Sequence, residues 1–408
     1  MTIDELERWL AEDSPQRTKL ERVREHVAMI RALPDDAYAR ALRAIKKRVS
    51  SPKLAAEVAA LIGELAHGRE TKPVGASQPE PAPVPWVGTT EDIAEIEAAI
   101  AADPDAQGPY TVLGDYWTAS GDIRGELIVI GAALAKNPTH KVMRAAWTKL
   151  YDEHRRKLWG ELAGTIDRIL YDVDWYMGFV RACRIPRYGR CAEVVDVLLD
   201  DPGPGRFIQR LAIDSDGAEV ARVLAKRPRP TLRTLELACF EPSGDLSPLW
   251  PSLAHLRTLT IRGKNLALGE IHAPQLERFA IELGTLDNED ELQDLGFLAS
   301  LWRGDGIPNL RAIALTNCEH TDALCDALVA SPIAERLVEI DLREGTMTEA
   351  GAALLYTHRD RFPNAQRWNF DLNFLTVEAC TRLAALGGEV STNCQRVTDG
   401  NRHAAAYE

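Results

Sequence analysis

The sequence predicts an α/β protein in which a long solenoid of repeated strand units follows two small all-α units. Three observations support this prediction. An apolar phrase, Leu-x-x-Leu-x-Leu, recurs between Phe207 and Asp371, the N-terminal part carries apolar residues at helical spacing, and a proline-rich segment interrupts that part. Because a chain of 408 residues exceeds the size of a single core, several structural units are expected.

Residues 1–70 are predicted to form a helical N-terminal module. Thr2 and Glu5 have the spacing of a capping box, and Ser14 and Ser51 each precede a proline that suits a first helical turn. Apolar residues recur there at helical spacing, which gives each helix a stripe to bury against a partner. We therefore expect several helices that pack together.

Residues 71–88 are predicted to be a proline-rich linker. Five prolines fall between Lys72 and Pro85, without apolar periodicity. Since proline fixes φ and removes a backbone donor, this segment should be an extended, semi-rigid spacer. Two other interpretations stay open, namely a protease-accessible site and a ligand for a proline-binding groove.

Residues 89–170 are predicted to form a second helical domain. They contain Asp103-Pro104-Asp105 and, further on, Gly121-Asp122-Ile123-Arg124-Gly125-Glu126. This combination resembles the bacterial repeat-companion domain, a family that typically precedes leucine-rich or similar repeats and has no established catalytic role. The resemblance covers about residues 94–165, with Tyr116-Trp117 in place of Trp-Leu and Ile123 in place of a proline.

The segment Gly121–Glu126 also has a physical explanation. Gly121 can adopt a positive φ to end one helix, and Asp122 can cap the next. Arg124 would then lie in a first helical turn, where it could pair with Asp115. A binding role for Asp115, Arg124 and Glu126 is the alternative interpretation.

Residues 171–395 are predicted to form the solenoid. Copies of the phrase begin at Ile208, Leu232, Leu256, Leu276, Leu310, Leu337 and Ala365, and a divergent earlier copy spans Phe179–Ile185. Their central residues are 20 to 34 residues apart and are Ala182, Leu211, Leu235, Leu259, Phe279, Ile313, Ile340 and Trp368. This pattern resembles leucine-rich repeats, in which each unit buries its apolar face by stacking on its neighbours. The apolar segment 171–179 is expected to cover the first repeat.

Helices should follow the strands of the later repeats, at residues 321–330, 348–356 and 376–386. The segment from Glu349 resembles the helical half of ribonuclease-inhibitor-type repeats. The early repeats, with steps of 24 and 20 residues, have room for short segments such as 247–254. Cys318 and Asn373 occupy the turn position where such repeats satisfy stacked backbone groups, so we expect both to be structural.

Side chains that alternate with the buried ones should face the concave surface of the sheet. Charged residues gather toward its C-terminal end, and the candidate partner-binding residues are Arg210, Arg278, Glu339, Asp341, Arg343, Arg367 and Asp371. These rows contain no aromatic residue. Because binding hot spots favour Trp, Tyr and Arg, the surface is a weaker candidate than repeat proteins usually provide.

The charge distribution favours a protein partner. The net charge is −13, and residues 191–408 carry 21 Lys and Arg against 33 Asp and Glu. An acidic surface repels phosphate backbones, so nucleic acid is not an expected partner, whereas a basic protein is compatible. A basic edge formed by Arg181, Arg184, Arg187 and Arg190 is an alternative surface, for phosphate or an acidic partner.

No catalytic, cofactor-binding or metal-binding residues are predicted. Seven cysteines without a C-x-x-C pair indicate neither a disulfide framework nor a zinc ribbon. Cys318, His320 and Cys325 could suggest a metal or thiol site, but both cysteines have structural explanations. The charged N-terminus and the lack of long apolar runs predict a cytoplasmic protein without a membrane partner. Residues 396–408 are expected to be a C-terminal tail.

These features predict a protein that is not an enzyme. We expect a protein–protein interaction scaffold, sensor or adaptor that uses the solenoid and a tethered helical module. The alternative is a regulatory inhibitor or a protease substrate of an effector enzyme, cut in the proline-rich linker or signalling through it. The identity of the protein partner does not follow from the sequence.

Overall fold

The computed structural model describes residues 90–187, 191–200, 203–215, 218–239, 244–263, 266–284, 295–397 and 404. They belong to one compact unit, Trp86–Glu408. The predicted module 1–70, the predicted linker 71–88 and most of the predicted tail 396–408 lie outside the described residues.

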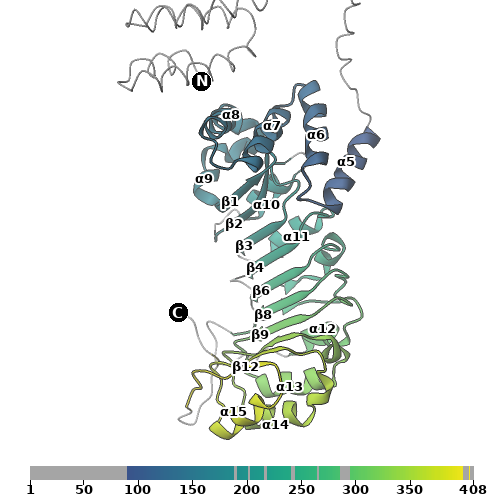
Figure 1. The fold of residues 1–408 in the computed structure, drawn as a ribbon, viewed down its shortest axis with the longest axis vertical. Helices are drawn as coiled ribbons and strands as arrows, with labels where there is room; N and C mark the ends of the chain where they lie inside the picture. Colours follow the sequence, from purple (N-terminus) through teal and green to yellow (C-terminus); the bar gives the residue numbers. More distant parts are fainter. Residues whose placement is uncertain are drawn as a thin grey trace, which may run out of the picture. The chain divides into compact units, whose positions relative to one another are not determined.

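The described chain begins with a helical domain (Figure 1). Its elements are α5 (Thr90–Ala102), α6 (Gln107–Ala119), α7 (Ile123–Lys136), α8 (Lys141–Trp159), the 3-10 helix η1 (Gly160–Gly164) and α9 (Ile166–Ile169). Gly121 ends the turn after α6 with a φ of +74°, and the Asp122 carboxylate caps α7 by accepting a hydrogen bond from the Arg124 backbone N–H. Both roles agree with the sequence prediction.

The sequence suggested that Arg124 pairs with Asp115. In the structure, the Arg124 guanidinium instead pairs with Asp122 at 2.6 Å. It also lies 4.3 Å from the centre of the Trp117 ring. The neighbouring Gly125 allows α6 and α7 to approach closely, because a Cβ there would lie 2.5 Å from the Thr118 backbone nitrogen. The segment Gly121–Glu126 therefore connects α6 to α7 and lets the two helices pack closely.

A ten-stranded sheet follows, and its strands are ordered as they occur in the chain. They are β1 (Tyr171–Tyr176), β2 (Phe179–Ile185), β3 (Arg210–Ser215), β4 (Thr234–Cys239), β6 (Thr258–Gly263), β8 (Arg278–Glu282), β9 (Ala312–Thr316), β10 (Glu339–Asp341), β11 (Arg367–Asn369) and β12 (Glu389–Ser391). The β1–β2 pair is antiparallel and the other pairs are parallel. A separate pair joins β5 (Gly244–Asp245) to β7 (Leu266–Ala267).

The strand register aligns the apolar phrases. From Leu211, the chain of direct pairs runs through Leu235, Leu259, Phe279, Ile313, Ile340 and Trp368. The first copy was misaligned by one residue in the sequence prediction, because Cys183, not Ala182, pairs with Leu211. β12 adds a strand that the phrase did not predict, with Val390 opposite Trp368.

The described helices of this region lie along one face of the sheet (Figure 1). They are α10 (Cys191–Leu199), α11 (Ala218–Ala225), η2 (Ser247–Ser252), η3 (Leu295–Leu298), α12 (Ala299–Arg303), α13 (Thr321–Ala330), η4 (Pro332–Arg336), α14 (Glu349–Thr357), η5 (Arg359–Arg361) and α15 (Val377–Ala384). The three later helices agree with prediction, and Thr348 and Thr376 cap α14 and α15. The early repeats carry short segments, as expected, since α11 has eight residues and η2 has six.

The core is continuous along the sheet. One buried cluster extends from Tyr151 to Leu383, and a smaller one joins α5 and α6 to the first strands through Met177, Phe179 and Phe207. The segment 171–179 thus packs the helical domain against the first strands, as expected. Within the described residues, no helix is long and apolar enough to cross a membrane.

Candidate interaction surface

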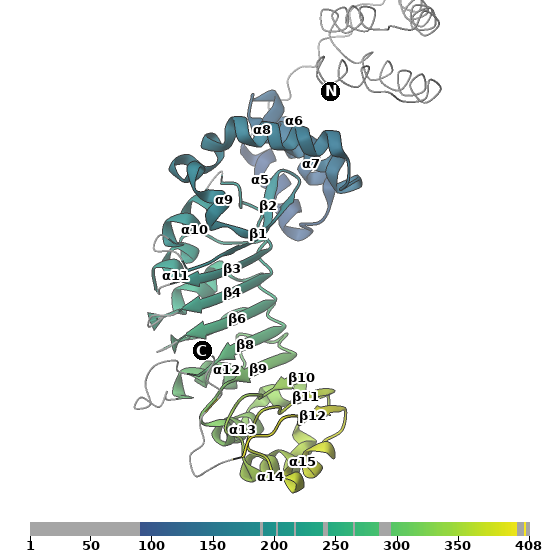
Figure 2. The ribbon, with the colours of Figure 1, turned by 90° about the vertical axis from the view of Figure 1, so that its left-hand side faces the viewer.

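The face of the sheet opposite the helices carries the side chains that were predicted to bind a partner. Figure 2 looks toward this face, which we call the open face. Its rows follow the strand register, one of them being Arg210, Thr234, Thr258, Arg278, Ala312, Glu339 and Arg367. The middle of the open face has small side chains, including Thr260, Ala280 and Ala314, which form one directly paired row.

The C-terminal end of the open face is a network of paired charges. The Glu339 carboxylate contacts the guanidinium groups of both Arg278 and Arg367. Asp341 lies 3.6 Å from the Arg343 guanidinium and accepts the Arg343 backbone N–H at 3.1 Å. Burial raises the pKa of the Asp341 carboxyl, against the effect of these contacts with Arg343. The predicted charged patch is thus largely neutralised within itself.

Two other predicted residues have separate surroundings. Asp371 accepts hydrogen bonds from the Ser391 hydroxyl at 2.7 Å and the Asn393 backbone N–H at 2.6 Å, so it anchors the last strand. Arg210 lies at the other end of the sheet and approaches Asp174 of β1 at 3.6 Å. The seven candidates therefore do not form one patch.

The predicted basic edge is divided by the fold. Arg181 pairs with Asp174 at 2.7 Å, whereas Arg184 lies on the open face and pairs with Glu236 at 2.8 Å. Arg187 is exposed, and Arg190 lies outside the described residues. The Arg181 and Arg184 guanidinium groups are engaged by carboxylates, so a phosphate or an acidic partner would have to compete with these ion pairs.

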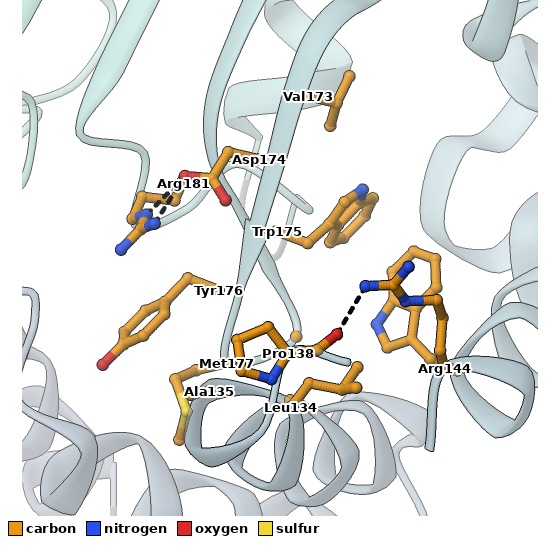
Figure 3. A pocket seen from close by; sticks show the side chains of 13 residues that line it. Leu134, Ala135, Pro138, Arg144, Val173, Asp174, Trp175, Tyr176, Met177 and Arg181 are labelled. Atoms are coloured by element: carbon orange, nitrogen blue, oxygen red, sulfur yellow. Dashed lines mark hydrogen bonds and ion pairs between the residues drawn. The ribbon is translucent and has the colours of Figure 1, made fainter. Parts of the chain in front are cut away.

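Aromatic and arginine side chains gather instead around β1, where the sequence had suggested only an apolar cover. A hollow of about 510 Å³ lies there between α7, α8 and β1, and we call it the β1 hollow (Figure 3). Its lining includes Leu134, Pro138, Arg144, Trp147, Trp175 and Arg181. The sequence signal was the segment from Tyr171 to Phe179, rich in aromatic residues, but its partners on α7 and α8 could not be identified from spacing.

A second hollow of about 600 Å³, beside α5, is less informative. Arg233 projects there, but it donates hydrogen bonds to the carbonyls of Ala101 and Pro230 at 2.7 and 2.6 Å. Its guanidinium therefore stabilises the C-terminal end of α5, where a cation is favourable. The position of Arg233 in that hollow is thus explained by its structural role at the end of α5.

The cysteine chemistry considered from the sequence is not favoured by the surroundings. Burial raises the pKa of Cys318 to about 12 and also raises that of Cys325, so both thiols stay protonated at neutral pH. Within the described residues, no group of three or more His, Cys, Asp or Glu side chains is arranged to hold a metal ion.

The predicted turn residue Asn373 is fully buried. Its amide donates to the carbonyls of Leu342 and Phe370 at 2.8 and 3.1 Å, and its side-chain oxygen accepts the Met347 backbone N–H at 2.9 Å. These contacts join adjacent repeats, as expected for this position.

Comparisons with known proteins identify no family. No family model matches the chain, and no curated protein matches it. Among solved structures, one similar chain is a protein from Bacteroides fragilis known by its crystal structure. The similarity has a TM-score of 0.40 and 19% identity, and it covers 63% of this chain and 84% of that one. A similarity at this level carries no argument about function.

Proposed function

We propose that this protein is a non-enzymatic protein–protein interaction scaffold or adaptor, with its repeated strands forming a leucine-rich-repeat solenoid. The observation that supports the proposal is the open face. Sheets of parallel strands are usually covered on both faces, whereas the described helices here lie along one of them. A sheet face that none of the described helices covers leaves a long, regular surface for a partner.

The side chains of the open face suit contact with a protein. The small residues at its centre let a partner approach the sheet, and the paired charges at its C-terminal end offer directional contacts. Because Glu339 is shared by two arginines, a partner that binds any of these three side chains must compete with the existing ion pairs. Such a surface confers specificity and association rate more than affinity.

We place this function in the cytoplasm. Cys183, Cys318 and Cys325 are buried free thiols. Free thiols of this kind suit a reducing compartment, where disulfides are rare. The helical domain that packs against the first strands is, in this proposal, a repeat-companion domain that buries part of the end of the solenoid and leaves the β1 hollow open.

The experiment compares two alanine-to-arginine variants. Ala280→Arg places a long cation at the centre of the open face, and Ala299→Arg makes the same change at an exposed position at the start of α12 on the helical side. Full-length proteins are used to capture partners from native lysate, and the captured proteins are quantified by mass spectrometry. We expect at least one partner to be reduced about tenfold by Ala280→Arg alone, which corresponds to about 1.4 kcal/mol.

If wild type and both variants capture every recovered protein equally, the proposal that the open face binds partners is refuted. Melting curves of the two variants serve as the control for folding. Both positions are accessible to solvent, so neither substitution should change the melting temperature by more than a few degrees.

A further inference from the structure

The first strand of the sheet has an unpaired edge. Within the part of the chain that the structure describes, β1 pairs with β2 and no strand lies on its other side. An edge strand presents alternate backbone N–H and C=O groups that have no partner in the sheet. Proteins commonly use such an edge to bind an extended peptide as an additional strand.

The β1 hollow follows this edge. Figure 3 shows Val173 and Trp175 on one side of the β1 ribbon, with Asp174 and Tyr176 on the other. The pairing of β1 with β2 shifts register between Tyr171 and Trp175, but the side chains from Val173 to Tyr176 still alternate. A cavity lined by both sets therefore runs along this part of the strand edge. The opposite wall consists of α7 residues, Pro138 and the start of α8.

The walls of the β1 hollow are held in place before any partner binds. Trp175 packs edge-on against Trp147 and Tyr151, with ring centroids 4.9 and 5.5 Å apart. The Tyr176 hydroxyl donates to the Asp105 carbonyl, which ties β1 to the turn after α5. Preorganised aromatic walls reduce the entropy cost of binding.

The charged side chains that line the β1 hollow make contacts within the protein. Asp174 pairs with Arg181 at 2.7 Å, and the Arg144 guanidinium donates to the Pro138 carbonyl at 2.6 Å. A charged group on the β1 side of the hollow would have to compete with the Asp174–Arg181 ion pair. An apolar group would instead contact Leu134, Trp147 and Trp175, so the occupant of the hollow should be uncharged.

We propose that the β1 hollow binds an extended peptide segment of a partner protein, which adds a strand to β1 and inserts an uncharged apolar side chain between α7 and Trp175. A helix satisfies its own backbone groups and would leave the β1 edge unpaired, so an extended backbone is the better complement. The hollow is within the size range of specific ligand sites and is surrounded by Trp, Tyr and Arg, the residue types of binding hot spots. The proposal rests on the proposed function in that the ligand belongs to a protein, but it uses a different surface.

The test begins with a random dodecapeptide library displayed on phage and selected against the full-length protein. Enriched peptides are synthesised with a fluorescent label, and binding is measured by anisotropy. Ala135→Trp fills the β1 hollow from α7, and Val129→Trp makes a matched addition at an exposed α7 position that does not line it. We expect enriched peptides to share an apolar residue and to bind Ala135→Trp at least tenfold more weakly, with Val129→Trp unchanged.

A second measurement tests the strand geometry. N-methylation removes one backbone donor at a time, so methylation along the peptide should weaken binding at every second residue. Equal effects at all positions, or none, would contradict strand addition. So would a selection in which no enriched peptide distinguishes Ala135→Trp from Val129→Trp.

The open-face proposal and the β1-hollow proposal can be refuted independently of each other. Ala280→Arg should leave peptide binding to the β1 hollow unchanged. Peptides that bind Ala135→Trp normally and lose affinity for Ala280→Arg would overturn the β1 proposal, while they would support the open face as an interaction surface.

Discussion

Replacing Asn373 by alanine removes the side chain that connects three backbone segments of the last repeats. The amide donates to the carbonyls of Leu342 and Phe370, and the side-chain oxygen accepts the Met347 N–H at 2.9 Å. Asn373 and Met347 are both 0% exposed, so water cannot replace the lost partner without structural change.

The expected loss of stability follows from these contacts. Leaving the Met347 N–H buried without an acceptor costs about 1–3 kcal/mol, and each hydrogen bond to a carbonyl contributes about 0.5–1.5 kcal/mol. Asn373→Ala should therefore lower the free energy of unfolding by roughly 3 kcal/mol, a large share of the about 5–15 kcal/mol typical of folded proteins.

The assay is equilibrium urea unfolding of the full-length protein at pH 7, followed by circular dichroism. Asn369→Ala is the matched control, because the half-buried Asn369 side chain accepts one backbone N–H, from Asp371 at 3.0 Å. The control should lose about 1 kcal/mol or less. Equal losses for the two variants would show that the buried network does not connect the repeats as the hydrogen bonds indicate.

Three further predictions concern the core, the open face and the thiols. Leu259→Asp places an unpaired carboxylate in a fully buried row and should prevent soluble expression or lower the melting temperature sharply, whereas Thr260→Asp on the open face should not. Because burial raises the pKa of Asp341, its ionisation opposes folding as pH rises past the unfolded-state pKa; Asp341→Asn should stabilise the protein at pH 7, and the gain in urea unfolding should vanish near pH 3. Iodoacetamide at pH 8 should modify the exposed Cys394 and leave the buried Cys325 unmodified until urea is added, as peptide mass mapping would show; early labelling of Cys325 would contradict its burial.

The strands and the buried rows were predictable because they depend on local patterns. The spacing of Leu235, Leu259 and Phe279 indicates strands that must be buried on one side, and their direct pairing agrees with it. The first copy of the phrase was misaligned at Ala182, since its apolar run has no unique period-two register. The sequence prediction missed β12 because this strand has three residues, Glu389–Ser391, of which Val390 alone is apolar.

The candidate surface was less predictable than the fold. The sequence identified the residues of the open face, but not that Glu339 contacts both Arg278 and Arg367. These residues come from three different repeats, and a pattern within one repeat cannot specify which long side chains meet. The sequence also did not reveal the ion pairs of Arg181 and Arg184, because their partners Asp174 and Glu236 lie on other strands.

The sequence by itself determined where the repeated strands lie, which side chains they bury and why Asn373 occupies its turn, because backbone periodicity and turn chemistry act over a few residues. The tertiary structure alone decided that β1 forms the edge of the sheet and that Trp147 of α8 packs against Trp175 beside an open hollow. That hollow depends on how two helices and a strand pack against one another. Such packing is set by contacts between segments that are distant in the chain, which no local pattern encodes.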